Sequence, residues 1–207
     1  DVGRLTFQYA EQIFGIGKEL VDVVTGRSAP RPRALSLGIV DAVPKLMVYR
    51  LLYPALRLKP AVRVACVEGT PERLLAELAT HHLDLVLSDA PAPATTKIRA
   101  YSHLLGESGV GLFGVKSFSR LKRGLPASLS GVPLLMPTEA ATLRRSIDRW
   151  FEAHDVTPNI VGEFEDSALM MVFGQKGLGL FPAPLALARD IKLQHGADLV
   201  GRLDGLT

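Results

Sequence analysis

The sequence of 207 residues has one cysteine and no long apolar run. Cys66 can form no intrachain disulfide, which fits a reducing compartment, and its setting in the stretch VRVACV predicts a small buried hydrophobe rather than a reactive thiol. No stretch approaches the roughly 18 apolar residues of a membrane span, and residues 1–12 lack the layout of a signal peptide. We therefore expect a soluble, cytoplasmic protein with no membrane partner.

Blocks of like charge and catalytic motifs are also missing. The 24 basic and 21 acidic residues are interspersed, so the net charge of +3 does not by itself predict nucleic-acid binding. The sequence contains no HExxH, Walker or CxxC pattern, which argues against a hydrolase, a zinc enzyme and a nucleotidase. We predict that the protein is not an enzyme, although an enzyme on an α/β scaffold remains an alternative because fold does not determine function.

An amphipathic helix is predicted at the start of the chain, followed by a tether. Over residues 4–25 the apolar positions recur every three or four residues, which draws a single stripe along a helix. Residues 28–33, SAPRPR, read as extended, because each proline disfavours a helix in the residue before it. The stripe needs a partner surface and consists of Leu5, Tyr9, Ile13, Ile16, Leu20 and Val24.

Strand-like and helix-like segments then alternate, which predicts an α/β fold. Within residues 34–88, three short apolar runs are separated by two helical patterns of about a dozen residues, the signature of βαβ units and a mostly parallel sheet. A second such series occupies residues 109–182. We expect two αβ lobes with a cleft between them, and ligands of open α/β sheets bind at the carboxyl ends of the strands.

Polar residues follow several of the predicted strands and should converge on this cleft. For any one of them a turn or capping role is an equal alternative, but a group of such residues without a poised nucleophile or base suggests a binding site rather than a catalytic one. The candidate effector-binding residues are Asp41, Ala42, Val43, Gly69, Thr70, Ser88, Asp89, Pro137, Thr138, Glu165 and Asp166.

Several strings of the sequence resemble the effector-binding domain of LysR-type transcriptional regulators. These are LTFQYAEQIF, LGIVDAVPKL, EGTPERLLAELATHHLDLVLSD, LLMPTEAATLRRSIDRWF and ALMMVFGQKGLGLFP, and the likeness covers nearly the whole chain. DA after the first strand, SD after the third and GEFED are similar to the branch of that family that responds to sodium and activates sodium/proton antiporter genes.

The resemblance implies a fold of the periplasmic-binding-protein type 2, preceded by a linker helix. Residues 1–33 would be the linker and dimerisation helix with its tether, 34–108 effector-binding subdomain I and 109–207 subdomain II. An N-terminal winged helix-turn-helix would bind promoter DNA, and we expect it to be absent from this chain, together with a C-terminal return to subdomain I. The protein would assemble with itself as a dimer or tetramer and respond to a small effector.

The resemblance also implies a dimer interface built from the helices at residues 44–57 and 140–154. Burial in the protein's own core is the alternative for the large side chains of these two helices, and the sequence leaves both possibilities open. The residues concerned are Tyr49, Leu52, Tyr53, Ile147, Trp150 and Phe151.

Asp41 stands where a helix N-terminus would otherwise attract an anion. We hypothesise that its carboxylate repels a second negative charge and makes the site prefer a cation. Sodium, a hard ion, needs several oxygen ligands, so Asp41 and Asp89 are the candidate metal ligands, with Glu165 and Asp166 nearby. The alternative is that Asp41 only caps the helix. No other cofactor is expected.

Two other binding proteins would fit the same pattern. One is a LysR-type regulator that senses a small organic anion, in which Arg144 and Arg145 could pair with a carboxylate. The other is a stand-alone solute-binding protein of the transport type, which shares the two-lobed architecture. The predicted linker helix and the missing signal peptide argue against the second.

Overall fold

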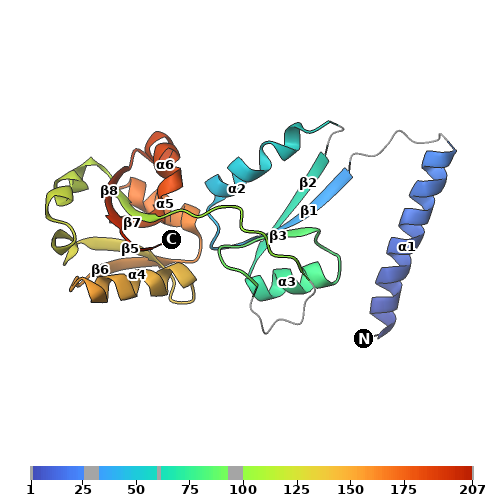
Figure 1. Ribbon diagram of the computed structural model, residues 1–207, viewed down its shortest axis with the longest axis horizontal. Helices are drawn as coiled ribbons and strands as arrows, with labels where there is room; N and C mark the ends of the chain where they lie inside the picture. The colour runs from blue at the N-terminus through green and yellow to red at the C-terminus, as the bar shows by residue number, and fades with distance from the viewer. Residues whose placement is uncertain (1, 26–32, 60–61, 93–99, 207) are drawn as a thin grey trace.

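The computed structural model describes residues 2–25, 33–59, 62–92 and 100–206. Two αβ lobes lie side by side, and the long helix α1 (Val2–Val24) stands apart from both (Figure 1). Most of the predicted tether at 28–33 lies outside the described residues. No helix in the described ranges is long and apolar enough to cross a membrane.

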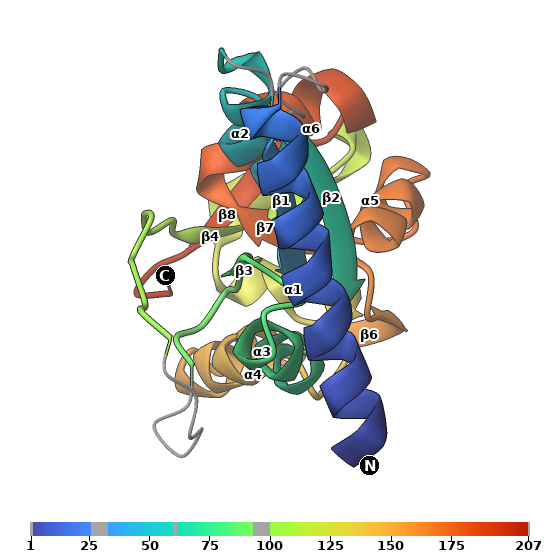
Figure 2. The same cartoon turned by 90° about the vertical axis from the view of Figure 1, so that its right-hand side faces the viewer.

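The apolar stripe of α1, a helix that Figure 2 shows in front of lobe I, is exposed to solvent at the positions whose side chains are described. Ile13, Ile16, Leu20 and Val24 are each exposed by more than 60%. The described part of the chain therefore does not cover this stripe, in keeping with a helix that needs a partner from elsewhere.

Lobe I contains a parallel sheet in the order β2-β1-β3, formed by β1 (Arg33–Val40), β2 (Val62–Gly69) and β3 (Leu85–Leu87). The central strand β1 buries Leu37, Ile39 and Val40, as expected for a continuous apolar run between two neighbours. Helices α2 (Lys45–Leu52) and α3 (Pro71–Ala79) and the short η1 (Ala55–Arg57) complete the lobe. Thr70 is the N-cap residue of α3, and Pro71 occupies the first position of the helix, where proline is favoured.

The prediction that Cys66 is buried was wrong. Cys66 is exposed on β2, which lies at an edge of the lobe I sheet, and Ala65 beside it is exposed as well. A β-rich composition indicates a strand, but it does not indicate whether that strand is central or at an edge, nor which face is covered.

Lobe II combines two small sheets. Strands β4 (Val110–Gly114), β7 (Phe181–Pro184) and β8 (Asp198–Leu203) form an antiparallel sheet in the order β7-β4-β8, and β5 (Pro133–Pro137) pairs in parallel with β6 (Asn159–Phe164). The expected parallel pairing therefore holds for β5 and β6 but not for β4. An isolated bridge between Leu134 and Leu180 joins the two sheets.

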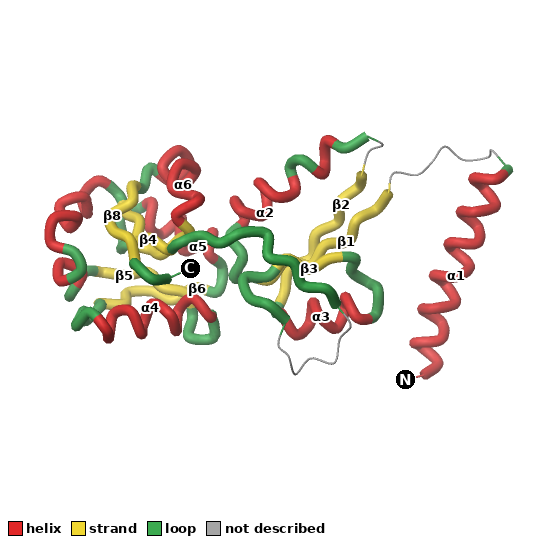
Figure 3. The backbone as a smooth tube through the Cα atoms, in the orientation of Figure 1, coloured by secondary structure: helices red, strands yellow, loops and turns green. Residues whose placement is uncertain are grey.

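Helices cover the lobe II strands on two sides (Figure 3). Helix α4 (Thr142–Ala153) lies on one side, and α5 (Ser167–Gln175) and α6 (Ala188–His195) pack against each other on the other. The short helices are η2 (Lys116–Gly124), η3 (Ala127–Leu129) and η4 (Leu185–Leu187). Ile147, Trp150 and Phe151 of α4 face inward and join the core of the lobe.

Helix α2 contacts the cores of both lobes. Val48 belongs to the lobe I core, whereas Leu46 and Met47 pack against the lobe II cluster that contains Met170. Arg50 of the same helix donates a hydrogen bond of 2.9 Å to the carbonyl oxygen of Ala186 and pairs with Asp190 at 2.5 Å. The two lobes are thus joined by apolar and ionic contacts through a single helix.

Candidate functional site

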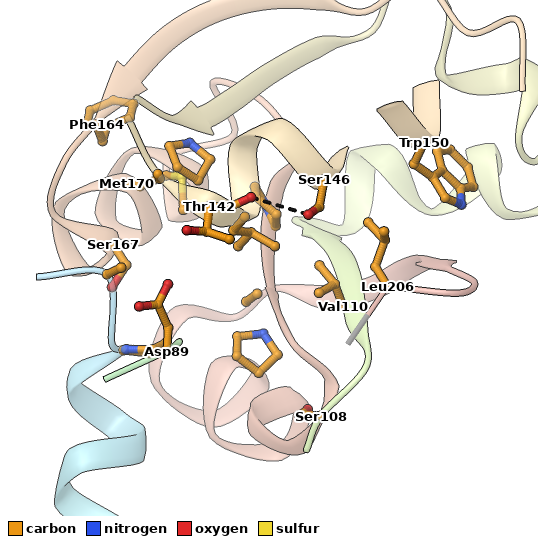
Figure 4. A pocket seen from close by; sticks show the side chains of 18 of the residues that line it. Asp89, Ser108, Val110, Thr142, Ser146, Trp150, Phe164, Ser167, Met170 and Leu206 are labelled. Carbon is orange, nitrogen blue, oxygen red and sulfur yellow. Dashed lines mark hydrogen bonds between the residues drawn. The ribbon is translucent and has the colours of Figure 1, made fainter. Parts of the chain in front are cut away.

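A cavity of about 590 Å³ lies where the two lobes meet (Figure 4). Lobe I supplies Ala42 and Pro44 from the β1–α2 connection and Asp89 from the loop after β3. The remaining walls come from lobe II, mainly from α4, the start of α5, β7 and the turn after β8. Its volume falls within the range of 300–1,000 Å³ that is usual for small-molecule sites.

One wall of the cavity is a polar stripe on α4. Thr142, Ser146 and Arg149 are four and three residues apart, so they share a face of the helix. Ser146 Oγ donates to the carbonyl oxygen of Thr142 at 3.3 Å, the dashed line of Figure 4, and Arg149 donates to Ser146 Oγ at 3.4 Å. On the next face, Trp150 Nε1 donates to the carbonyl oxygen of Asp204 at 3.1 Å, which ties the turn after β8 to this wall.

A second wall is the start of α5. Asp166 is the N-cap of this helix, and its carboxylate accepts a hydrogen bond of 2.7 Å from the Ala168 N–H. Met170 and Met171 add buried apolar surface to the cavity. The hydroxyl oxygen of Ser167 is buried and has no hydrogen-bond partner among the described residues.

Four charged residues are among those that line the cavity, namely the acidic Asp89, Glu165 and Asp204 and the basic Arg149. Figure 4 shows the Asp89 carboxylate at the cavity. None of these four forms an ion pair with another described residue. The described residues also contain no group of three or more His, Cys, Asp or Glu side chains arranged to hold a metal ion.

Arg144, between the cavity-lining residues Leu143 and Ser146 on α4, is buried and hydrogen-bonded within lobe II through Nε and Nη1. Its Nε donates to both carboxylate oxygens of Asp148, at 3.0 and 2.9 Å, and Nη1 donates to Glu163 and, at 3.0 Å, to the carbonyl oxygen of Pro137. Burial lowers the pKa of the Arg144 guanidinium, but its bonds to Glu163 and Asp148 outweigh this effect, so the pKa is raised from its usual value. Arg144 therefore joins β5, α4 and β6, and it does not line the cavity.

Comparison with known proteins identifies the chain at the level of its family. The family model described as "LysR substrate binding domain" matches residues 28–197. The chain belongs to this family. Among curated proteins, the transcriptional activator protein NhaR of Escherichia coli K12 is 30% identical over 206 residues, which is 100% of this chain and 67% of NhaR. The predicted family is thereby confirmed.

Solved LysR regulators share the fold at lower sequence identity. The reduced regulatory domain of OxyR2 from Vibrio vulnificus aligns with a TM-score of 0.60 and 14% identity, covering 84% of this chain and 82% of that one. HinK, a LysR family regulator from Pseudomonas aeruginosa, aligns with a TM-score of 0.56 and 16% identity, covering 89% of this chain and 64% of HinK. The predicted two-lobed fold of the periplasmic-binding-protein type 2 is thereby confirmed, and the relatives are transcriptional regulators.

The structure brings some of the predicted effector-binding residues of this LysR domain together. Ala42, Asp89, Pro137 and Glu165 all line the interlobe cavity. The others do not line it, namely Asp41, Val43, Gly69, Thr70, Ser88, Thr138 and Asp166. Val43 belongs to the lobe I core and Asp166 caps α5, which accounts for two of them.

Asp41, on which the sodium hypothesis was centred, lies outside the cavity lining. Its N–H donates to the carbonyl oxygen of Gly69 at 3.3 Å, which continues the pairing of β1 with β2 beyond the last residue of β1. The alternative role as a helix cap was wrong, because Pro44 is the N-cap residue of α2 and this helix has no side-chain cap. Asp89 does line the cavity, so of the two predicted metal ligands one lies at the cavity and the other does not.

Sequence reasoning missed the α4 stripe and the turn after β8. Thr142, Ser146 and Arg149 could have been found from the sequence. Their spacing of three and four residues places them on one face of a helix, and this helix directly follows the predicted strand-end loop at residues 137–139. Asp204, Gly205 and Leu206 have no such signal, since only the folding of lobe II brings them against α4.

The residues proposed for a dimer interface separate into two groups. Ile147, Trp150 and Phe151 are buried in the lobe II core, which was the alternative to an interface role. Tyr49 and Tyr53 are exposed, with ring centroids 5.5 Å apart, and Leu52 is half-buried. The Arg57 guanidinium lies 4.6 Å from the centre of the Tyr53 ring, which extends this exposed aromatic surface.

Proposed function

We propose that this chain is the sensing domain of a LysR-type transcriptional activator whose effector occupies the interlobe cavity. The observation that carries the proposal is that the cavity walls come from both lobes, with Asp89 on one side and Glu165 on the other. A ligand that contacts both walls has different affinities for open and closed arrangements of the lobes, and it therefore shifts their populations.

The signal would pass to a DNA-binding domain outside this chain. The exposed apolar stripe of α1 supports pairing with the same helix of a second copy, because an uncovered stripe of this length favours association. A change in lobe closure would alter how copies pack and so reset the spacing of the DNA-binding domains on a promoter. Couplings of this kind are usually about 1 to 3 kcal/mol.

Filling the cavity tests this function directly. In the full-length regulator, Ser146→Trp should abolish effector-dependent activation of a promoter reporter while leaving promoter binding within about twofold, because the new indole occupies ligand space without touching the DNA-binding domain. Arg145→Trp, on an exposed face of the same helix outside the cavity lining, is the matched control. Full inducibility of Ser146→Trp would contradict the proposed site.

Sodium is the effector that the resemblance to the sodium-responsive branch favours. Within the cavity, Asp89 and Glu165 are the oxygen ligands it could use, together with main-chain carbonyl oxygens and water. A direct sodium sensor should show a saturable rise in the unfolding midpoint with sodium or lithium chloride but not with potassium chloride at equal ionic strength. Asp89→Asn should remove that rise, whereas Asp41→Asn, outside the cavity lining, should leave it unchanged. Identical melting curves in all three salts would exclude sodium as the direct effector.

A further inference from the structure

We propose that Arg50 of α2 forms an interlobe latch with Ala186 and Asp190 of lobe II, and that this latch holds the two lobes in the arrangement of this structure. The latch concerns the restraint between the lobes and not the ligand of the cavity, so it goes beyond the proposed function and does not depend on it. The contacts of Arg50, the anchoring of α2 in lobe I and a hydrogen-bonded link to the cavity lining carry the proposal.

The Arg50 guanidinium makes two contacts with lobe II at once. Its Nη1 donates to the carbonyl oxygen of Ala186 at 2.9 Å, and its Nη2 donates to a carboxylate oxygen of Asp190 at 2.5 Å. Ala186 belongs to η4 and Asp190 to the first turn of α6, which follows η4 directly, so one continuous segment of lobe II supplies both acceptors. A planar guanidinium presents its N–H groups in a fixed fork, and it can therefore hold a carbonyl and a carboxylate together.

Helix α2 is also anchored in lobe I. Lys45, its first residue, pairs with Glu68 of β2 at 2.8 Å, and Val48 is buried in the lobe I core. Arg50 follows Lys45 by about 8 Å along the helix axis, so a single short helix carries one ion pair to each lobe. Movement of α2 and lobe I away from α6 therefore requires the Arg50 contacts to break.

Ser108 links the latch to the lining of the cavity. It lies in the loop at residues 100–109, through which the described chain passes from lobe I to lobe II (Figure 3), and it is one of the residues labelled around the cavity in Figure 4. The Ser108 hydroxyl oxygen accepts a hydrogen bond of 3.1 Å from the Ala186 N–H, while the Ala186 carbonyl oxygen accepts from Arg50. The loop between the lobes and α2 are thus both bonded to the same residue of η4.

The strength of the latch suits a contact that opens and closes. The side chains of Arg50 and Asp190 are 42% and 27% exposed, so water screens their attraction and can solvate both groups when they separate. For a pair in this setting, loss of the contact should change the population ratio of two lobe arrangements by up to about fivefold. The latch therefore restrains the lobes without locking them, and a ligand can still shift their populations.

The test measures the distance between spin labels on the two lobes of the 207-residue chain. Cys66, the single cysteine, is exposed on β2 of lobe I, and Glu152→Cys adds a second exposed site on α4 of lobe II. Pulsed electron paramagnetic resonance gives the distribution of label distances, with an excess of unlabelled chain to remove distances between copies. Arg50→Gln should broaden this distribution or add a second distance, because the lobes then occupy further arrangements. Lys45→Gln, which removes the ion pair of the same helix within lobe I, is the matched control and should leave the distribution unchanged.

A second variant removes the other partner of the latch. Asp190→Asn should change the distribution in the same direction, and its combination with Arg50→Gln should give the result of Arg50→Gln alone, because Asp190 acts through Arg50. A distribution that Arg50→Gln leaves unchanged would overturn the latch. An equal change in Lys45→Gln would also overturn it, because the effect would then belong to α2 and not to its contact with lobe II. Neither result bears on the effector site, which Ser146→Trp tests in the promoter assay.

Discussion

Replacing Arg144 with alanine is expected to destabilise the protein by about 2 to 3 kcal/mol. Only 6% of Arg144 is exposed, and its guanidinium connects Asp148, Glu163 and the carbonyl oxygen of Pro137. The substitution removes these hydrogen bonds and the buried aliphatic stem together. Both carboxylate partners are more than 40% exposed, so water can solvate them after the loss, which keeps the effect below that of breaking a fully buried pair.

Urea unfolding of Arg144→Ala and of Arg145→Ala provides the comparison. Arg145 is the exposed neighbour on the same helix, and its substitution should change the free energy of unfolding by no more than about 0.5 kcal/mol. Equal unfolding free energies for the two variants would show that the Arg144 network contributes nothing. Because Pro137 and Thr142 line the cavity, Arg144→Ala should also weaken ligand binding without touching the ligand.

Gly174→Ala is expected to destabilise the protein by about 1 to 3 kcal/mol even though alanine favours helices. Gly174 is buried in α5 against Phe181, and a Cβ built on it would lie 2.1 Å from Cδ1 and 2.5 Å from Cε1 of that ring. Phe181 cannot easily move, because it is fully buried and its ring stacks on Phe113 with centroids 6.1 Å apart. The gain in helix propensity is about 1 kcal/mol, so the steric conflict should dominate.

The matched control is Gly15→Ala in α1, where a new Cβ meets no atom within 4 Å. This change should leave the unfolding midpoint of the lobes unchanged and increase the helix content of α1, because alanine has the higher helix propensity. A Gly174→Ala variant with native stability would show that the Phe113 and Phe181 rings can repack.

The alternation of apolar and helical patterns was sufficient to predict the two αβ lobes, but the pairing of strands in lobe II was not predictable in the same way. The second predicted series, residues 109–182, begins with β4 (Val110–Gly114) and ends within β7 (Phe181–Pro184) in the structure. The spacing of apolar residues within a segment predicts that the segment is a strand, but it does not predict which other strand pairs with it. The antiparallel pairing of β4 with β7 and β8 could therefore not be inferred from the sequence pattern.

The candidate site shows the same limit. The strand-end rule led to Asp89, Pro137 and Glu165, because it applies wherever parallel strands end at one edge. It also selected Thr70 and Ser88, which follow β2 and β3 but do not line the cavity. Asp204 was missed because its position depends on the contact between Trp150 and the turn after β8, which joins segments 54 residues apart.

Helix α2 bears on how the molecule can move. With Val48 in one core, Leu46 and Met47 on the other, and Arg50 bound to α6, this helix cannot follow one lobe without leaving contacts on the other. Packed side chains tolerate few intermediate positions, so such a helix exchanges one set of neighbours for another in a discrete step. The domain would therefore respond to its ligand as a two-position switch rather than in proportion to a gradual bending.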